Sequence, residues 1–338
     1  MYQFIVSFDI SKLTLDSTII INGDLLAASH QTLENNEDSI VKLFKGYLKQ
    51  PEFTFENCLI CIEATGVYTY PLLSFAAKNN AKIWIESGVQ IKKSIGIQRG
   101  KSDKVDSFRI AEYAFKNQEK ARLWKPSNQI ITQIKHLTSL RVRLLKSRHS
   151  LVIPVKEFEE VGDLKMAKIL GKAMKSSLVS IEADIKKIEG QIITLLEGDS
   201  GLKELFSLVT SVVGIGNQTA LALIIYTDAF TLFDDPRKLA CYAGVAPFAY
   251  ASGTSIKGKP RVSKMANITL KTTLHMASLT AVKLDIQLKK YYDRKVAEGK
   301  AKMSVLNAVK AKLLHRVMSV VQRNKKYENS ADFSLVLS

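Results

Sequence analysis

The chain has 338 residues, of which 46% are hydrophobic and 24% are charged, a composition that indicates a folded protein and excludes a disordered one. Its 49 Lys and Arg residues outnumber 32 Asp and Glu residues, and the net charge is +17. No stretch reaches the roughly 20 apolar residues of a membrane span, so we expect a polyanionic partner, nucleic acid rather than a membrane surface. The length predicts two domains joined by a linking segment.

The N-terminus and the cysteines indicate a reducing compartment, for which we expect the cytoplasm. The opening residues, MYQFIVSFD, contain no basic region and no cleavage site, unlike a signal peptide. Three cysteines in a chain of this length fit a reduced protein. Cys58 and Cys61 form a CxxC pair inside the apolar run CLICI without a second Cys or His pair, so we interpret them as buried strand thiols.

Residues 1–122 predict an α/β domain. Strands are expected at 3–9, 15–21 and 25–31, and Asn22-Gly23 favours a type I′ hairpin turn between the last two. The pattern then alternates, with a helix over 39–48, a strand over 58–63, a helix over 67–78 and a strand over 82–86. Three strands followed by alternating helices and strands is the order of a ribonuclease-H-like domain.

Four carboxylates fall where such a domain would bring them together. Asp9 ends the first apolar strand, Glu63 ends the run CLICIE, and Asp103 and Asp106 share one face of a helix that Ser102 is predicted to cap. Acids gathered at one sheet edge repel one another unless a divalent cation neutralises them, so the sequence predicts a metal site. A simpler alternative is that the two helical acids only suit the helix dipole. Asp16 falls on the next strand and is not included.

Residues 123–200 predict a helical hairpin or coiled coil. Pro154 is expected to separate two helices. The second helix has apolar residues at alternating steps of three and four, which favours pairing within the chain or between subunits, with a slight preference for oligomerisation. These residues are Leu178, Ile181, Ile185, Ile188, Ile192 and Leu195.

Residues 201–325 predict a second, mainly α domain, followed by a tail over 326–338. The segment VTSVVGIGNQTALALII has the form of a helix-hairpin-helix turn whose backbone N–H groups face phosphate, although an ordinary tight helix connection remains the alternative. A glycine-rich basic loop then leads to a helix starting near Asn267. Ser252 in this loop is a hydroxyl among cations, a candidate nucleophile on phosphate, but most such serines only hydrogen-bond a turn.

Basic and glycine residues near these candidate sites are expected to contact a phosphate backbone. They are Lys92, Lys93, Arg99, Lys101, Lys104, Gly214, Gly216, Lys257, Lys259, Arg261 and Lys264.

The ordered motifs DISK, EATGVYTYPL, KSDKVDSFRIA, GIGNQTA, YAGVAP, SG and SKMAN resemble the insertion-sequence-110 (IS110) family of transposases, the bridge-RNA-guided DNA recombinases. The resemblance implies a RuvC-like domain whose catalytic, Mg²⁺-binding acids are Asp9, Glu63, Asp103 and Asp106, a coiled coil, and a C-terminal domain in which Ser252 forms a transient phosphoserine link. It also implies a prokaryotic host, target and donor DNA, a non-coding bridge RNA, and a homo-oligomer, dimer or tetramer, that pairs acids from one subunit with serine from another.

The chain departs from the family pattern near the serine. Ala266 stands where glycine is usual, Lys271 where arginine is usual, and Ala251 where a polar residue is common. His275 is a candidate base for Ser252 only if its helix folds back. Two other functions stay open: a Holliday-junction-type nuclease that uses the acids alone, with Ser252 structural, and a nucleic-acid-binding scaffold with an inactive site.

Overall fold

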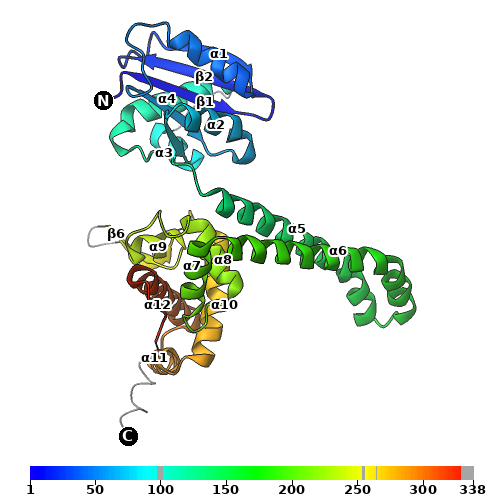
Figure 1. Ribbon diagram of the computed structural model, residues 1–338. Coiled ribbons are helices and arrows are strands. Elements are labelled where there is room, and N and C mark those ends of the chain that lie inside the picture. The colour runs from blue at the N-terminus through cyan, green and yellow to red at the C-terminus, as the bar shows by residue number, and fades with distance from the viewer. Residues whose placement is uncertain (97–101, 253–255, 264, 329–338) are drawn as a thin grey trace. The chain divides into compact units, whose positions relative to one another are not determined.

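A computed structural model describes residues 1–96, 102–252, 256–263 and 265–328. The chain divides into two compact units, an N-terminal unit of residues 1–126 and a C-terminal unit of residues 127–338 (Figure 1).

The N-terminal unit is built on a five-stranded sheet. Its strand order is β3-β2-β1-β4-β5; β1 is antiparallel to β2 and parallel to β4, and β4 is parallel to β5. The mixed sheet follows the predicted ribonuclease-H-like order. Its elements are β1 (Phe4–Ile10), β2 (Thr14–Ile21), β3 (Ser29–Glu34), α1 (Glu37–Tyr47), β4 (Cys58–Glu63), the 3₁₀ turn η1 (Gly66–Thr69), α2 (Tyr70–Lys78), β5 (Lys82–Glu86), α3 (Gly88–Ile95), α4 (Asp103–Asn117) and the 3₁₀ turn η2 (Gln118–Lys120).

Helices cover both faces of this sheet. On one face α1 and α2 pack through Phe44 and Phe75, whose rings stack with centroids 4.8 Å apart. On the other face α3 and α4 cover a second cluster that contains Ile5, Leu59 and Ile110. Because both faces are covered, β1 and β4 are almost continuously buried, which explains their uninterrupted apolar sequences. Cys58 and Cys61 are buried strand thiols, as predicted, and burial raises the pKa of Cys58 to about 12.

The turn after β2 confirms one prediction and corrects another. Asn22 and Gly23 have φ values of 51° and 76°, the left-handed backbone that the Asn-Gly pair predicts. The return strand, however, begins at Ser29, whereas we expected it from Leu25. The Asp24 side chain accepts hydrogen bonds from the backbone N–H groups of residues 26 and 27, which extends the turn and delays the strand.

The C-terminal unit combines a long helical hairpin with a compact helical core. Ile131 and Ile134 of α5 and Ile188 and Ile192 of α6 are buried in one cluster with the helices that follow, so the predicted 123–200 segment joins the core of the 201–325 segment. The elements are α5 (Gln129–Glu160), α6 (Leu164–Gly198), α7 (Ser200–Thr210), α8 (Asn217–Thr227), α9 (Pro236–Tyr242), β6 (Pro247–Ser252), β7 (Ile256–Val262), α10 (Ile268–Leu284), α11 (Ile286–Ala297) and α12 (Lys302–Arg323).

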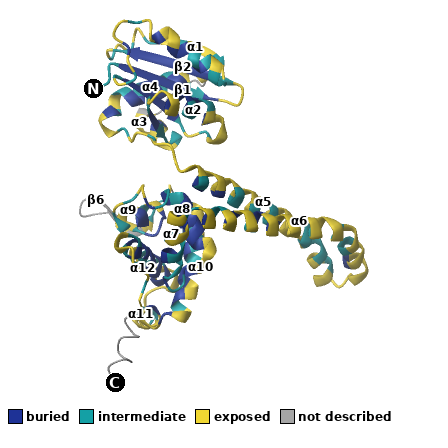
Figure 2. Cartoon of the chain, in the orientation of Figure 1, coloured by how far each residue is buried: buried dark blue, intermediate teal, exposed yellow. Residues whose placement is uncertain are grey.

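The helical hairpin pairs α5 with α6 within the chain. Ile185, Ile188 and Ile192 are buried along the predicted seam, and Arg141 Nε binds Glu189 Oε1 at 2.7 Å across it. The prediction that Pro154 separates the helices was wrong, because α5 continues through it to Glu160. The turn between α5 and α6 is at Gly162, which has a φ of 84°. Both long helices stay largely exposed along the hairpin (Figure 2).

The segment predicted as a basic loop is a β-hairpin. Strands β6 and β7 pair antiparallel, with Pro247 opposite Val262 and Ser252 opposite Ile256. Gly258 and two prolines in these strands weakened the strand signal of the sequence. The following helix begins as expected, with Asn267 as its N-cap. None of the helices among the described residues is long and apolar enough to cross a membrane.

Candidate active site

The structure gathers the four predicted carboxylates around the end of β1. Asp9 lies on the sheet face that α4 covers, Glu63 ends the parallel neighbour β4, and Asp103 and Asp106 occupy the first turn of α4. Burial first, and then the charges of Asp106, Asp103, Glu63 and, least, Asp16, together raise the pKa of Asp9 from its usual 3.8 to about 6. The carboxylates therefore share one electrostatic environment, although they come from three separate segments.

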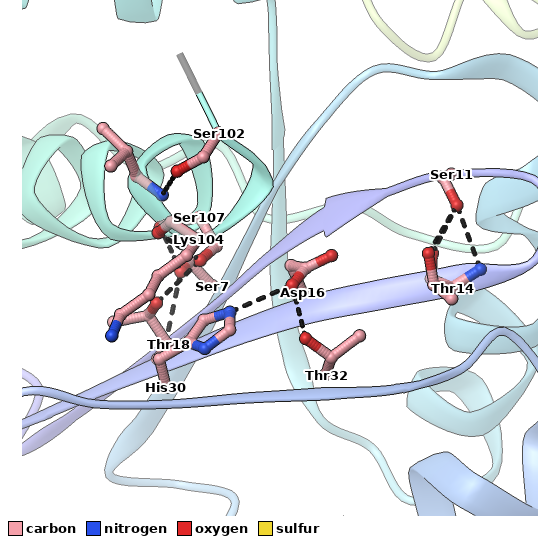
Figure 3. A network of polar contacts seen from close by, with 11 residues as sticks. Ser7, Ser11, Thr14, Asp16, Thr18, His30, Thr32, Ser102, Lys104 and Ser107 are labelled. Atoms are coloured by element: carbon pink, nitrogen blue, oxygen red, sulfur yellow. Dashed lines mark hydrogen bonds and ion pairs between the residues drawn. The ribbon is translucent and has the colours of Figure 1, made fainter. Parts of the chain in front are cut away.

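A buried hydroxyl network holds α4 against the strand that carries Asp9 (Figure 3). Ser7, two residues before Asp9, donates to the carbonyl oxygen of Ser107 at 2.6 Å. The Ser107 hydroxyl donates to the Lys104 carbonyl at 2.9 Å, which leaves Thr18 of β2 to donate to Ser107 Oγ at 2.8 Å. Ser102 caps α4 as predicted, accepting from the Val105 N–H. These bonds fix the turn that presents Asp103 and Asp106.

Glu63 is positioned by a glycine. A Cβ atom on Gly88, the first residue of α3, would lie 1.9 Å from Glu63 Oε1. The carboxylate therefore occupies space that a side chain at residue 88 would fill. Next to it, Glu86 accepts hydrogen bonds from the Ser87 N–H and, at 3.2 Å, from the Tyr113 hydroxyl.

Asp16, which we left out of the predicted site, lies directly opposite Asp9 in the antiparallel register of β1 and β2. Residues opposite each other in a sheet point to the same face. Asp16 Oδ1 accepts from Thr32 Oγ1 at 2.7 Å and lies 3.0 Å from His30 Nε2 (Figure 3). The two strands must be paired in register before this proximity can be read from the sequence.

The donor set suits a hard cation. All four predicted ligands offer carboxylate oxygens, which Mg²⁺ prefers. Asp106 already has a cationic partner, since its Oδ1 accepts from Arg109 Nη1 at 2.9 Å. Within the described part of the chain, no three His, Cys, Asp or Glu side chains are arranged to hold one metal ion. Mg²⁺ commonly uses one or two carboxylates, waters and substrate phosphates, so the chemistry of the carboxylates remains compatible with it.

The second candidate centre lies at the tip of the β6–β7 hairpin, where Ser252 is the last residue of β6. The base of the hairpin is held between α9 and α10. Asn267 donates its backbone N–H to the Tyr242 carbonyl at 2.8 Å and its side-chain amide to the Tyr242 hydroxyl at 3.1 Å. Gly244, with a φ of 65°, lies so close to Ala266 that a Cβ atom would be 2.4 Å from its methyl group. The YAGVAP and SKMAN motifs therefore contact each other.

The predicted phosphate-contacting residues differ in their surroundings. Lys92, Lys93, Lys104 and Arg261 are exposed, as a backbone contact requires. The positions of Lys257 and Lys259 are described only as backbone, and Arg99, Lys101 and Lys264 lie outside the described residues.

The two glycines of the predicted helix-hairpin-helix turn face different ways. A Cβ on Gly214, which has a φ of 95°, would be 2.5 Å from Ala281 Cβ of α10, so packing accounts for this glycine. Gly216 is exposed at the N-cap of α8, with no atom near the space that a Cβ would take.

A ribonuclease-H-like sheet with acids at the ends of β1 and β4 and on a closing helix fits the class of enzymes that act on the phosphodiester bonds of nucleic acid. Two family models narrow this class. A transposase model, that of the Asp-Glu-Asp-Asp type of IS110 elements, matches residues 6–158, and the model of the IS116/IS110/IS902 transposase family matches residues 206–293. The chain belongs to the IS110 family of transposases and is a DNA recombinase.

Curated relatives agree with this assignment. The pilin gene-inverting proteins of Moraxella lacunata and Moraxella bovis are each 25% identical over 339 residues, covering 97% of this chain and 98% of the relative. An uncharacterised 43.6 kDa protein of insertion element IS110 from Streptomyces coelicolor is 29% identical over 161 residues, 48% of this chain and 38% of the relative.

Proposed function

We propose that the protein is an insertion-sequence recombinase that cuts and rejoins DNA with two cooperating centres. Asp9, Glu63, Asp103 and Asp106 hold Mg²⁺ at the DNA phosphate, and Ser252 is the nucleophile. A bound Mg²⁺ would polarise the phosphoryl oxygens and offset charge that develops during transfer.

The observation that carries this proposal is the placement of Asp106, Asp103 and Glu63 around the half-buried carboxylate of Asp9, which raises the pKa of Asp9. The pKa reaches about 6 because the carboxylate is partly buried and other acids, Asp106 first, surround it. A folded protein that keeps several acids around a half-buried carboxylate gains no stability from doing so. A cation and a phosphate that bind there would offset the repulsion, and perturbed groups of this kind cluster at functional sites.

The chemistry at Ser252 is an exchange of phosphodiester bonds. The hydroxyl oxygen forms a bond to phosphorus, one strand P–O bond breaks, and the departing deoxyribose oxygen takes up a proton in place of the one that Ser252 loses. The phosphoserine link conserves the energy of the broken bond, so a hydroxyl of another strand can reverse the exchange and rejoin the DNA. This reversibility suits recombination, whereas a hydrolytic nuclease ends at the cut.

The partners follow from charge and family. A net charge of +17 suits polyanions, and the Moraxella relatives are named for inverting a gene, a reaction that joins two DNA sites. We propose target and donor DNA, a bridge RNA that selects both by base pairing, and a homo-oligomer in which acids and serine of different subunits meet. Pairing by the RNA leaves the protein to recognise backbone and shape.

The role of a bridge RNA can be tested by expressing the protein together with the DNA that flanks its gene. The RNA that copurifies with the protein is then sequenced. One discrete RNA from the flank is the expected result. In the recombination assay Asp9→Ala and Ser252→Ala should both abolish strand transfer while DNA binding persists. Full recombination by Ser252→Ala would show the serine to be structural, and DNA cleavage without any bound RNA would favour the junction nuclease.

A further inference from the structure

A basic cleft opens in the C-terminal unit beside the base of the β6–β7 hairpin. It has a volume of about 970 Å³ and is bounded by α9, the outer ends of β6 and β7, α10 and α12. Four of these elements each contribute one cation to its wall, and no Asp or Glu lines it. The cations are Arg237 of α9, Arg261 of β7, Lys271 of α10 and Lys310 of α12.

Lys310 is the unusual member of this group. The residue is only 4% exposed, whereas Arg237 and Arg261 are exposed and Lys271 is half-buried. Among the described residues, none of the four side chains makes an ion pair or a hydrogen bond. Lysine is seldom buried to this degree without a partner, because even partial loss of hydration disfavours the charged ammonium group. Burial and the nearby Lys271 both lower the pKa of Lys310.

A bound anion would remove this cost. It would pair with Lys310 at the buried side of the cleft and relieve the repulsion among the four cations. Two neutral donors of α12, Ser304 and Asn307, also line the cleft, and Asn307 is held in place by donating to the Val245 carbonyl at 2.5 Å. Converging cations with neutral donors, and no acid among them, are the chemistry of a phosphate site.

The position of the cleft indicates which phosphate it holds. β6 begins at Pro247, in the wall of the cleft, and ends at Ser252. Five steps of about 3.3 Å along the strand, which has an irregularity between Phe248 and Tyr250, separate the two residues by at most about 17 Å. That span equals about five nucleotides of a duplex strand, which rises about 3.4 Å per nucleotide. A DNA strand that reaches Ser252 would therefore pass the cleft with a flanking phosphate.

We propose that this cleft binds a backbone phosphate of the DNA strand on which Ser252 acts, with Lys310 as its buried cation and Lys271, Arg237 and Arg261 around it. The inference rests on the proposed role of Ser252 for the identity of the strand. It assigns to Lys310 and Arg237, which lie outside the motifs around the serine, a function that the sequence did not suggest, and it gives Lys271 a role in phosphate binding.

The test compares Lys310→Met with Lys290→Met in the full-length protein. Lys290 is exposed on α11, so its replacement makes the same charge change away from the cleft. Affinity for a short labelled DNA duplex is measured over a series of salt concentrations. Lys310→Met should weaken binding about tenfold, the loss of one charged hydrogen bond, and reduce the salt slope by about one. Lys290→Met should change neither.

Thermal unfolding of each variant shows whether a loss of DNA binding comes from a loss of stability. Lys310→Met should unfold at the same or a higher temperature, because it removes an unpaired buried charge. Should it fail to fold, Lys271→Gln gives the same DNA readout from a half-buried position. Inorganic phosphate should stabilise the wild-type protein and not Lys310→Met.

Three results would overturn the proposal: wild-type affinity and salt slope in Lys310→Met and Lys271→Gln, an equal loss in Lys290→Met, or a loss seen with duplex RNA and absent with DNA. The DNA-binding assay does not depend on the reaction at Ser252. If Ser252→Ala still recombines DNA, the nucleophile proposal fails, while the salt slope continues to report on the cleft.

Discussion

Gly88 lies directly against the carboxylate of Glu63, with no room for a Cβ atom between them. The clash at 1.9 Å would involve the far end of a flexible side chain, which can rotate away without disturbing the backbone. Residue 88 therefore determines where the Glu63 carboxylate can lie, while contributing no chemical group of its own.

Gly88→Ala is expected to preserve the fold and reduce DNA cleavage, because the displaced Glu63 no longer lies beside Asp9. We expect the free energy of unfolding to change by less than about 1 kcal/mol, as for most substitutions outside a core. The rate of strand cleavage should fall at least tenfold. Gly46→Ala in α1 is the matched control, since a Cβ there meets nothing within 4 Å. Wild-type cleavage in Gly88→Ala would show that the Glu63 position is not critical.

Asp9 predicts an unusual pH dependence of stability in the metal-free protein. The pKa of Asp9 is about 6 in the folded protein and 3.8 ordinarily. The stability that the protonated carboxyl contributes to the fold is therefore fully present below pH 3.8 and is lost as the pH rises through 6. Asp9→Asn should therefore be more stable than the wild type at pH 7, by about 1–2 kcal/mol after allowing for partial exposure. The two proteins should converge near pH 4.

Chemical denaturation at a series of pH values measures this difference. Asp184→Asn, on the exposed face of α6, is the control and should show no comparable gain. Added Mg²⁺ should stabilise the wild type and not Asp9→Asn. An Asp9→Asn variant that is less stable than wild type at pH 7 without metal would contradict the electrostatic description of the site.

Much of the N-terminal unit could be predicted because its signals are local. The strand over 58–63, the left-handed Asn22-Gly23 turn and the Ser102 cap each depend on a few adjacent residues. The positions of the four acids followed once the strand order was assigned. Asp16 was left out of the predicted site, and its proximity to Asp9 could not be read from the sequence because it depends on the β1–β2 register.

The C-terminal unit was harder to predict because long-range packing overrides local preference there. Pro154 lies inside α5, whose partner α6 continues alongside it, although proline usually ends a helix. The β6–β7 hairpin forms despite glycine and proline in its strands. Lys310 could not be found from sequence at all, since apolar neighbours at helical spacing do not reveal that an unpaired cation lines a cleft.

Ser107 links the acidic turn of α4 to the sheet, and its removal should affect both stability and activity. Ser107→Ala leaves the buried Thr18 hydroxyl without its acceptor, a loss of about 1–3 kcal/mol. The double variant Ser107→Ala/Thr18→Val removes both polar groups and should recover part of that stability. Strand cleavage should be reduced in both, because the first turn of α4 loses its bond to Thr18 and keeps only the Ser7 bond to the Ser107 carbonyl and the Ser102 cap. Additive destabilisation in the double variant would contradict a direct coupling.

Asn267 makes two separable contributions at the base of the serine hairpin. Its side-chain oxygen caps α10 by accepting from the Leu270 N–H at 3.0 Å, and its amide donates to the Tyr242 hydroxyl. Asn267→Ser keeps a capping oxygen and is too short to reach Tyr242, whereas Asn267→Ala loses both contacts. We expect Asn267→Ala to lose about 1 kcal/mol of stability through the cap and Asn267→Ser to lose less.

Substitutions at Asn267 and Tyr242 should affect recombination differently from stability. Asn267→Ser and Tyr242→Phe both break the side-chain link between α9 and α10, so both should reduce formation of the covalent link between Ser252 and DNA to a similar degree. The double variant should be no worse than either single variant, since one shared contact is lost. Trapping of the protein–DNA adduct measures this directly. Wild-type adduct levels in Tyr242→Phe would mean that the backbone bond from Asn267 to the Tyr242 carbonyl alone is sufficient to hold the hairpin base.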